Sequence, residues 1–174
     1  MTRSFATLAP QEALHVAIFI EERNAEVYHR FAEMFVEFAD WESLEIAGVF
    51  WEMAIEERRH SSMLQASYVE RYGNSSCHIT DDELVEFIEV PRLNQSEIFQ
   101  PGDSNDALAP RNRALQVALR AEISAHNYYA GLAEATHDEA LRQMYRDLAH
   151  MEDGHVAYLE AKLTGDPTEE NLVN

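Results

Sequence analysis

The chain has 174 residues, which suits one domain, and 46% of them are hydrophobic, enough to bury a sizeable core. Its one cysteine, Cys77, excludes a disulfide framework or a four-cysteine metal module within this chain. The net charge of −19 excludes nucleic acid and anionic membrane surfaces as partners, because both would be repelled. No run of about 20 apolar residues could span a membrane, and the N-terminus lacks the apolar core of a signal peptide. We therefore expect a soluble, cytoplasmic protein.

The first half of the chain predicts two helices. The first begins at Pro10, because proline suits the first helical position, where its missing N–H would be unpaired anyway. Its apolar stripe repeats in alternate steps of four and three residues, typical of a helix in a bundle. The stripe comprises Leu14, Ile18, Glu21, Ala25, Tyr28, Ala32 and Phe35. The second helix covers about 42–72, ends at Gly73, and carries a stripe of Phe50, Met53, Glu57, His60 and Leu64.

A long connection, about 73–109, separates this pair from a second pair of helices. A capping box in T-D-D-E, from Thr80 to Glu83, predicts a short helix over about 81–89. The third helix should run from Pro110 to about 136, with a stripe of Leu115, Leu119, Glu122, His126, Tyr129 and Ala133. The fourth should cover about 138–163, with a stripe of Leu141, Tyr145, Leu148, Glu152, His155 and Leu159, and a polar tail follows over 165–174.

These elements predict one all-α domain, a four-helix bundle over about 10–163. The links within each helix pair are short, so each pair should form an antiparallel hairpin. The long connection is long enough to cross the full length of the bundle between the hairpins, because a helix of about 25 residues is only about 40 Å long.

The two hairpins are similar to each other in sequence. When the chain is shifted by 101 residues, Glu21 meets Glu122 and Tyr28 meets Tyr129; a shift of 95 residues brings Glu57 onto Glu152 and His60 onto His155. The matched polar residues within the apolar stripes are Glu21, Glu57, His60, Glu122, Glu152 and His155. Two further Glu-x-x-His pairs, Glu12/His15 and Glu26/His29, lie off the stripe and have no histidine counterpart. We interpret them as surface or boundary residues.

The six matched residues favour a site for two metal ions. Buried carboxylates are costly unless they are neutralised, and two divalent cations would balance four glutamates. Oxygen-rich sites with one imidazole per metal suit iron or manganese. The alternative is a buried network of protonated glutamate and histidine without metal, which would be a poor way to build a bundle core.

This order of ligands, Glu, Glu-x-x-His, Glu, Glu-x-x-His on four helices with a long second link, resembles the ferritin-like di-metal carboxylate superfamily. The pairs Glu21/Tyr28 and Glu122/Tyr129 are similar to a pattern of rubrerythrins and bacterioferritins. The resemblance implies one metal at Glu21, Glu57 and His60 and a second at Glu122, Glu152 and His155. It also implies that Glu57 and Glu152 bridge the two ions, and that Tyr28 and Tyr129 lie beside the site, unless they are ordinary core aromatics.

The sequence departs from rubrerythrin at two points. No C-x-x-C pair is present, so no rubredoxin-like domain is encoded here, and the extra glutamate of the third helix is replaced by Ala125. His126, one turn after Glu122, is either a neighbour of the site or an additional ligand; we favour the former.

The resemblance implies a di-iron protein with two iron ions, or manganese, in each chain. One interpretation is a rubrerythrin-like oxidoreductase that reacts with peroxide or oxygen and takes electrons from a separate donor. The alternative is a ferroxidase or iron-binding protein for iron handling or storage, although the polar tail argues against a ferritin cage. A bundle with a vestigial site is the third interpretation. We also expect a homodimer, with Phe38, Trp41 and Trp51 either at its interface or packed against the long connection.

Overall fold

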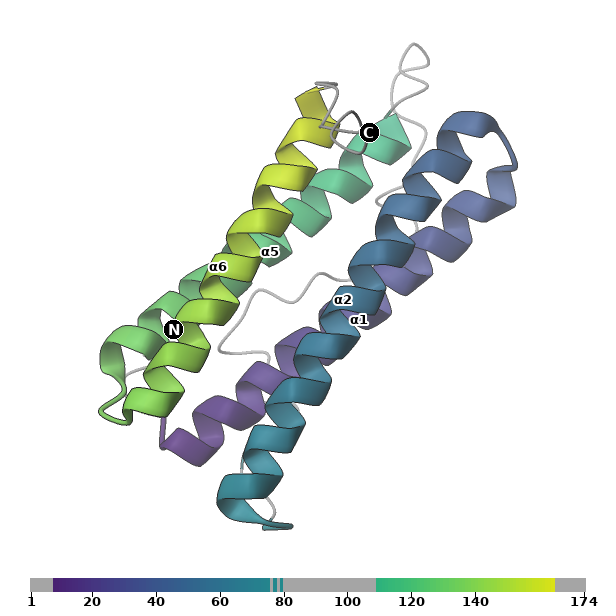
Figure 1. The fold of residues 1–174 in the computed structure, drawn as a ribbon. Coiled ribbons are helices and arrows are strands. Elements are labelled where there is room, and N and C mark those ends of the chain that lie inside the picture. The colour runs from purple at the N-terminus through teal and green to yellow at the C-terminus, as the bar shows by residue number, and fades with distance from the viewer. Residues whose placement is uncertain (1–7, 76, 78, 80–108, 165–174) are drawn as a thin grey trace, which may run out of the picture.

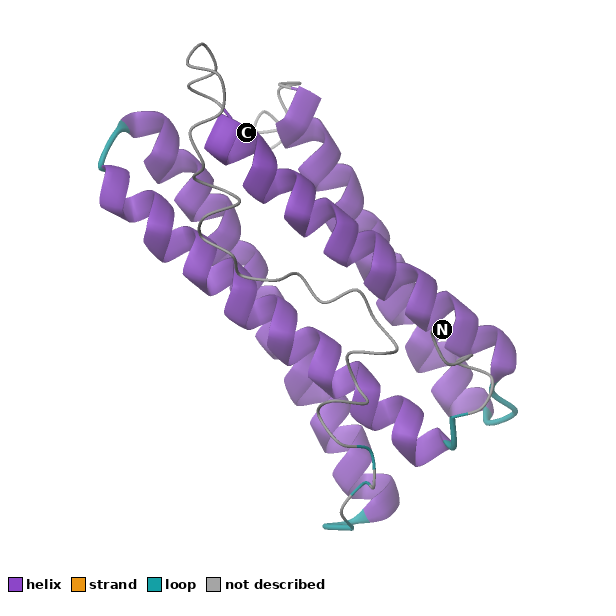
Figure 2. Cartoon of the chain, turned by 180° about the vertical axis from the view of Figure 1, so that it is seen from behind, coloured by secondary structure: helices purple, strands orange, loops and turns teal. Residues whose placement is uncertain are grey.

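The computed structural model describes residues 8–75, 77, 79 and 109–164, which form four helices (Figure 1). They are α1 (Pro10–Phe38), α2 (Trp41–Tyr72), α5 (Ala109–Ala135) and α6 (Glu139–Thr164). Figure 2 shows the same arrangement from behind: the α1–α2 hairpin lies along the α5–α6 hairpin, and no strand occurs in the part of the chain that is described. The predicted four-helix bundle is confirmed, with helix ends within one residue of their expected positions. The short helix over 81–89 and the tail over 165–174 lie outside the described residues.

Two residues make the turn between α1 and α2. Ala39 adopts a left-handed conformation, with φ of 55°, and its N–H donates to the Val36 carbonyl, which ends α1. The side chain of Asp40 then accepts a hydrogen bond of 2.8 Å from the Ser43 N–H and caps α2. Because α2 begins only two residues after α1 ends, the chain reverses direction and α2 runs antiparallel to α1.

Asp138 organises the corresponding turn between α5 and α6. Its Oδ1 accepts hydrogen bonds from the backbone N–H groups of Ala140 and Leu141, at 2.9 and 3.0 Å, which caps α6. Its Oδ2 pairs with Arg71, near the end of α2, at 2.8 Å. This ion pair ties the first hairpin to the turn of the second at one end of the bundle.

The apolar core consists of two clusters, one toward each end of the bundle. One contains residues of α1 from Ala13 to Ile20, together with the C-terminal half of α5 and the N-terminal half of α6. The other contains residues of α1 from Val27 to Phe35, with the N-terminal halves of α2 and α5. The middle of each helix, between the clusters, therefore faces a level of the bundle that is not apolar.

The predicted stripes are buried with few exceptions. Ile18, Leu119 and His126 are only partly buried, because they lie at the edge of their helices' inner face. Trp41, Phe38 and Trp51 are 80%, 54% and 39% exposed. The homodimer interface that we expect there stays a prediction. Among the described helices, none combines the length and the apolar character that crossing a bilayer requires.

Candidate metal centre

Six polar side chains occupy the level between the two apolar clusters. The four glutamates are fully buried, and the two histidines are 9% and 8% exposed; they are Glu21, Glu57, Glu122, Glu152, His60 and His155. All four helices contribute side chains to this level. Helices α2 and α6 each contribute a glutamate and a histidine three residues apart, which lie on the same face of the helix, and α1 and α5 each contribute one glutamate. These are the six residues that the sequence singled out.

The six residues form two groups of potential ligands that share two members. Glu21 and His60 combine with Glu57 and Glu152 in one group, and the same two glutamates combine with Glu122 and His155 in the other, all with ligand atoms within 4.8 Å of one another. Glu57 and Glu152 are the two members common to both groups, and that they bridge two ions stays a prediction. The structure brings the two halves of the duplicated hairpin together at this point.

Each histidine turns Nδ1 toward the carboxylates. Nδ1 of His60 lies 3.3 Å from Glu21 and 3.9 Å from both Glu57 and Glu152. Nδ1 of His155 lies 3.0 Å from Glu57, 3.3 Å from Glu122 and 3.4 Å from Glu152. The two rings lie nearly parallel, with centroids 5.7 Å apart. Both Nδ1 atoms are placed where they could complete a metal's ligand set.

Two buried tyrosines connect the hairpins through the site. Tyr28 on α1 donates its hydroxyl hydrogen bond to Glu122 on α5, and Tyr129 on α5 donates to Glu21 on α1. The arrangement is reciprocal, as expected for two related hairpins packed face to face. Burial, reinforced by the neighbouring carboxylates, raises the pKa of both phenols well above the usual value, so both are donors at neutral pH.

Replacing either tyrosine by phenylalanine should weaken metal binding by about tenfold, because the glutamate loses the donor that orients it. Tyr128 is the matched control. It is equally buried, but its hydroxyl donates to the backbone carbonyl of Ala13 at 2.9 Å, away from the site. Tyr128→Phe should lose a similar amount of stability, about 1 kcal/mol, and keep full metal affinity. Metal titration and thermal unfolding of Tyr28→Phe, Tyr129→Phe and Tyr128→Phe separate the two effects; equal affinities in all three would contradict the orienting role.

The shared glutamates are the least satisfied groups in the centre. Neither oxygen of Glu57 or Glu152 makes a hydrogen bond of good geometry within the described residues, and the same holds for Nδ1 of His60. Burial, together with repulsion from the surrounding carboxylates, raises the pKa of both glutamates well above 4.5. The environment therefore disfavours the bare anions strongly.

The pKa values of their neighbours shift with the same contacts. Burial alone would lower the pKa of His155, but its contacts with Glu122, Glu152 and Glu57 outweigh that effect and raise it far above its usual value. Burial alone would raise the pKa of Glu122, but its close contacts with Glu152 and His155 outweigh that effect and lower it. Without a cation, the raised pKa values of Glu57, Glu152 and His155 favour their protonated forms, which reduces the negative charge of the centre.

The residues present fit two divalent cations. Four carboxylates balance a charge of +4, and the oxygens of Glu57 and Glu152, which make no hydrogen bond of good geometry in the described chain, could act as ligands. Carboxylate oxygen with one imidazole nitrogen per position is a donor set that suits iron or manganese better than soft metals. No other described group of side chains offers such a set.

His126 lies apart from both groups of potential ligands. Its ring is 31% exposed, and Nε2 pairs with Asp153 on α6 at 3.3 Å. The stripe placed it in the core, but the helix turns its side chain to the edge between α5 and α6. The alternative that it is a seventh ligand is not supported by its position.

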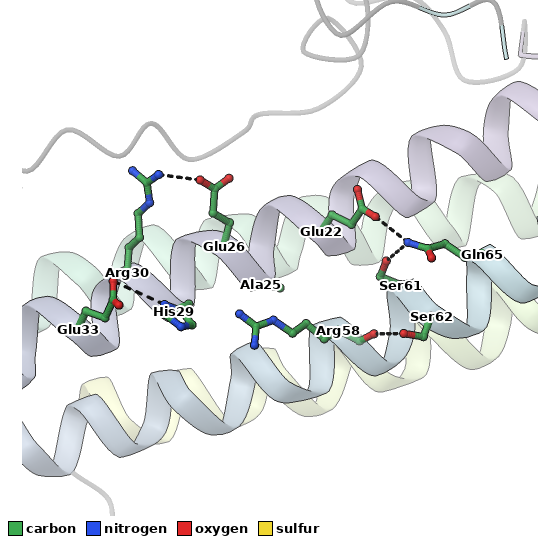
Figure 3. Close-up of a pocket in the computed structure, with 10 residues that line it drawn as sticks. All are labelled: Glu22, Ala25, Glu26, His29, Arg30, Glu33, Arg58, Ser61, Ser62 and Gln65. Carbon is green, nitrogen blue, oxygen red and sulfur yellow. Dashed lines mark hydrogen bonds and ion pairs between the residues drawn. The ribbon is translucent and has the colours of Figure 1, made fainter. Parts of the chain in front are cut away.

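Figure 3 shows the surface groove between α1 and α2 where one of the unmatched Glu-x-x-His pairs lies. Glu26 pairs with Arg30 at 2.9 Å, and His29 faces Glu33 at 3.6 Å, so each has a partner on its own helix. His15, of the other unmatched pair, lies partly buried beside Tyr68, with ring centroids 6.3 Å apart. Neither pair belongs to the metal centre, as the sequence comparison predicted.

A second groove opens onto the metal centre between α2 and α6. It has a volume of about 630 Å³ and is lined by both histidines, by Glu52 and Glu56, and by apolar side chains including Met151. Glu56 is half exposed and lies 2.9 Å from Nε2 of His155. The two histidines, at 9% and 8% exposure, are the members of the centre that line this groove.

Glu56, which contacts His155, and the buried Asn24 were not predicted from the sequence. Glu56 lies one position before a predicted ligand and off the apolar stripe, and it has no acidic counterpart in the other half, so no pattern in the sequence distinguishes it. Asn24 is buried at 4% exposure, with no hydrogen-bond partner in the described chain for its Nδ2. Its position one helical turn after Glu21 is the feature of the sequence that could have predicted its burial.

Comparisons with known proteins agree with this architecture. The family model described as Rubrerythrin matches residues 12–94, which include Glu21, Glu57 and His60. An uncharacterized conserved protein from Magnetospirillum magnetotacticum MS-1, known from a crystal structure, is similar in fold. The two structures superpose over 92% of this chain and 97% of that chain, with a TM-score of 0.69 and 23% sequence identity. No curated protein matches the chain in sequence.

Proposed function

We propose that the chain, a four-helix bundle that the Rubrerythrin family model matches over residues 12–94, is a di-iron oxidoreductase that reacts with peroxide or oxygen. The observation that carries the proposal is the pair of buried ligand groups that share Glu57 and Glu152. Six residues from four helices converge there, and the donor set suits iron or manganese. Two bound iron ions would supply the electrons that reduce the oxidant.

The protein's own residues would perform three tasks around the ions. Glu57 and Glu152 would neutralise charge in the buried interior, where unpaired ions are expensive. Tyr28 and Tyr129 would hold the two outer glutamates, Glu122 and Glu21, through their hydroxyl hydrogen bonds. The groove between α2 and α6 would admit a small oxidant beside the histidines, and the apolar clusters above and below would keep bulk water out.

The proposal predicts about two iron ions in each chain after purification from iron-supplemented cells, and fewer than one in Glu57→Ala and in Glu152→Ala. Elemental analysis measures the ratio. Each substitution removes a ligand from both groups at once, so both ions should be affected. Iron-free wild-type protein whose melting temperature does not respond to ferrous iron would overturn the proposal.

A second candidate is a ferroxidase that handles iron as its substrate. Two acidic side chains, Glu52 and Glu56, line the groove with one basic side chain, Arg59. This excess of negative charge favours the ferroxidase because it would attract cations toward the histidines, and the net charge of −19 acts in the same direction. A stopped-flow comparison separates the candidates. An oxidoreductase keeps its two ions through repeated additions of peroxide and reductant, whereas a ferroxidase oxidises many equivalents of added ferrous iron for each centre.

An oxidoreductase of this kind requires an external electron donor. We propose a separate redox protein for that role, since the chain has one cysteine and therefore no four-cysteine iron site of its own. The cytoplasm is the location we propose for both proteins.

A further inference from the structure

The two halves of the metal centre differ at one pair of equivalent positions. The shift of 95 residues that aligns Glu57 with Glu152 and His60 with His155 also aligns Glu56 with Met151. Both residues line the groove between α2 and α6, together with the two histidines. A carboxylate in the first half is thus replaced by a thioether in the second, in a centre that is otherwise closely symmetrical.

Glu56 contacts the histidine of the opposite hairpin. Its Oε2 lies 2.9 Å from Nε2 of His155, on the side of the ring away from the other glutamates. Since Nδ1 of His155 faces the potential ligands, a neutral ring that offers Nδ1 to a metal must carry its proton on Nε2. That proton is donated to Glu56. The contact selects this tautomer, fixes the orientation of the ring and makes Nδ1 more basic.

His60 lacks such a partner. Within the described part of the chain, the three ion-pair contacts of His60 all use Nδ1, and none uses Nε2. Met151, the counterpart of Glu56, is at best a weak acceptor. An Nε2 proton on His60 therefore has no acceptor among the described residues, and the ring makes only its Nδ1 contacts with the glutamates and its stacking on His155 in place of such a bond.

We propose that Glu56 makes the two metal positions unequal. The position at Glu122 and His155 binds its ion first and holds it more tightly, and the position at Glu21 and His60 binds second and exchanges more readily. Glu56 is a positioning residue that acts through His155. The inference rests on the proposed di-metal function, and it identifies which of the two ions is retained and which can be lost or replaced.

Substitutions at the two equivalent positions test the inference directly. Glu56→Met removes the carboxylate partner of His155, so that neither histidine has one at Nε2. Met151→Glu places a carboxylate at the equivalent position in the other half, so that each histidine has one. Metal-free protein is titrated anaerobically with Co²⁺ alone, by calorimetry and by the visible absorption of the bound ion. The wild type should bind two ions, and Glu56→Met should weaken the first by about 10- to 100-fold, the usual effect of losing such a hydrogen-bond partner. Met151→Glu should tighten the second ion, and the double exchange should reverse the order of loading.

Three controls separate this effect from simpler ones. Glu52→Gln removes a negative charge from the same groove without removing the hydrogen bond to His155, so it should weaken the first ion far less than Glu56→Met does. Glu56→Met should leave the melting temperature of the metal-free protein within a few degrees of the wild type, since Glu56 is half exposed. His60→Ala should retain the tight binding event, and His155→Ala should lose it.

The possible results distinguish failure of this inference from failure of the proposed function. Two ions that bind to the wild type, with a first affinity that Glu56→Met does not change, would overturn the role of Glu56 and leave the di-metal centre standing. An equal loss in Glu52→Gln would show that groove charge, rather than the hydrogen bond to His155, is responsible. A wild-type protein that binds no Co²⁺ would overturn both.

Discussion

Anaerobic addition of ferrous iron to the metal-free protein at pH 7.5 should raise its melting temperature by roughly 10–20 °C. A ligand at 100 times its Kd adds about 2.7 kcal/mol for each site, and in a chain of this size about 1 kcal/mol shifts the melting temperature by about 2–4 °C. In the metal-free protein, Glu57 and Glu152 must either bind protons or repel the neighbouring carboxylates, and both lower the stability of the folded state at this pH. Bound cations remove this cost because they neutralise the carboxylates. Differential scanning calorimetry with and without iron measures the shift.

The double variant Glu57→Gln/Glu152→Gln should lose this response, because both groups of potential ligands lose their shared members. Its metal-free form should be more stable than the metal-free wild type by about 1–4 kcal/mol at neutral pH, since neutral side chains replace buried acids. Glu26→Gln is the matched control: it alters a surface Glu-x-x-His pair and should keep the full shift. An iron-dependent shift that persists in the double variant would refute the assignment of these glutamates.

The metal-free protein should become less stable as the pH rises from 5.5 to 7.5. The pKa values of Glu57 and Glu152 are raised in the folded state, so their contribution to stability is complete below the unfolded value of 4.5 and is lost as the pH rises toward the folded values. His155 acts in the same direction above its unfolded value of 6.5. Each group contributes at most about 1.4 kcal/mol for each pH unit. Urea unfolding at pH 5.5, 6.5 and 7.5 measures the slope.

The same unfolding series on Glu57→Gln/Glu152→Gln should give a shallower slope. The overall negative charge also lowers stability at high pH, but it acts on both proteins, so the difference between their slopes reports the metal centre. Glu122 does not reverse the sign in this window, because its lowered pKa affects stability only below 4.5. Equal slopes in the two proteins would show that the buried glutamates do not hold extra protons.

The sequence by itself determined the helices and the six central residues. Helix ends follow from local chemistry, such as proline at the start of α1 and the glycine that ends α2, and local chemistry can be read along the chain. The six polar residues stand out because they interrupt apolar stripes at matching places in two related hairpins. A position within an apolar stripe faces the core, so the burial of Glu21 and Glu57 could be predicted from the sequence without the structure.

Only the tertiary structure decided what each side chain faces. The hydrogen bonds from Tyr28 to Glu122 and from Tyr129 to Glu21 depend on how one hairpin packs on the other, and a stripe carries no such information. His126 satisfies the stripe but turns to the edge of α5 and meets Asp153, because a small rotation of the helix changes which residues at its boundary are buried. Glu56 lies off every stripe, and its contact with His155 exists because α2 and α6 come together at the groove.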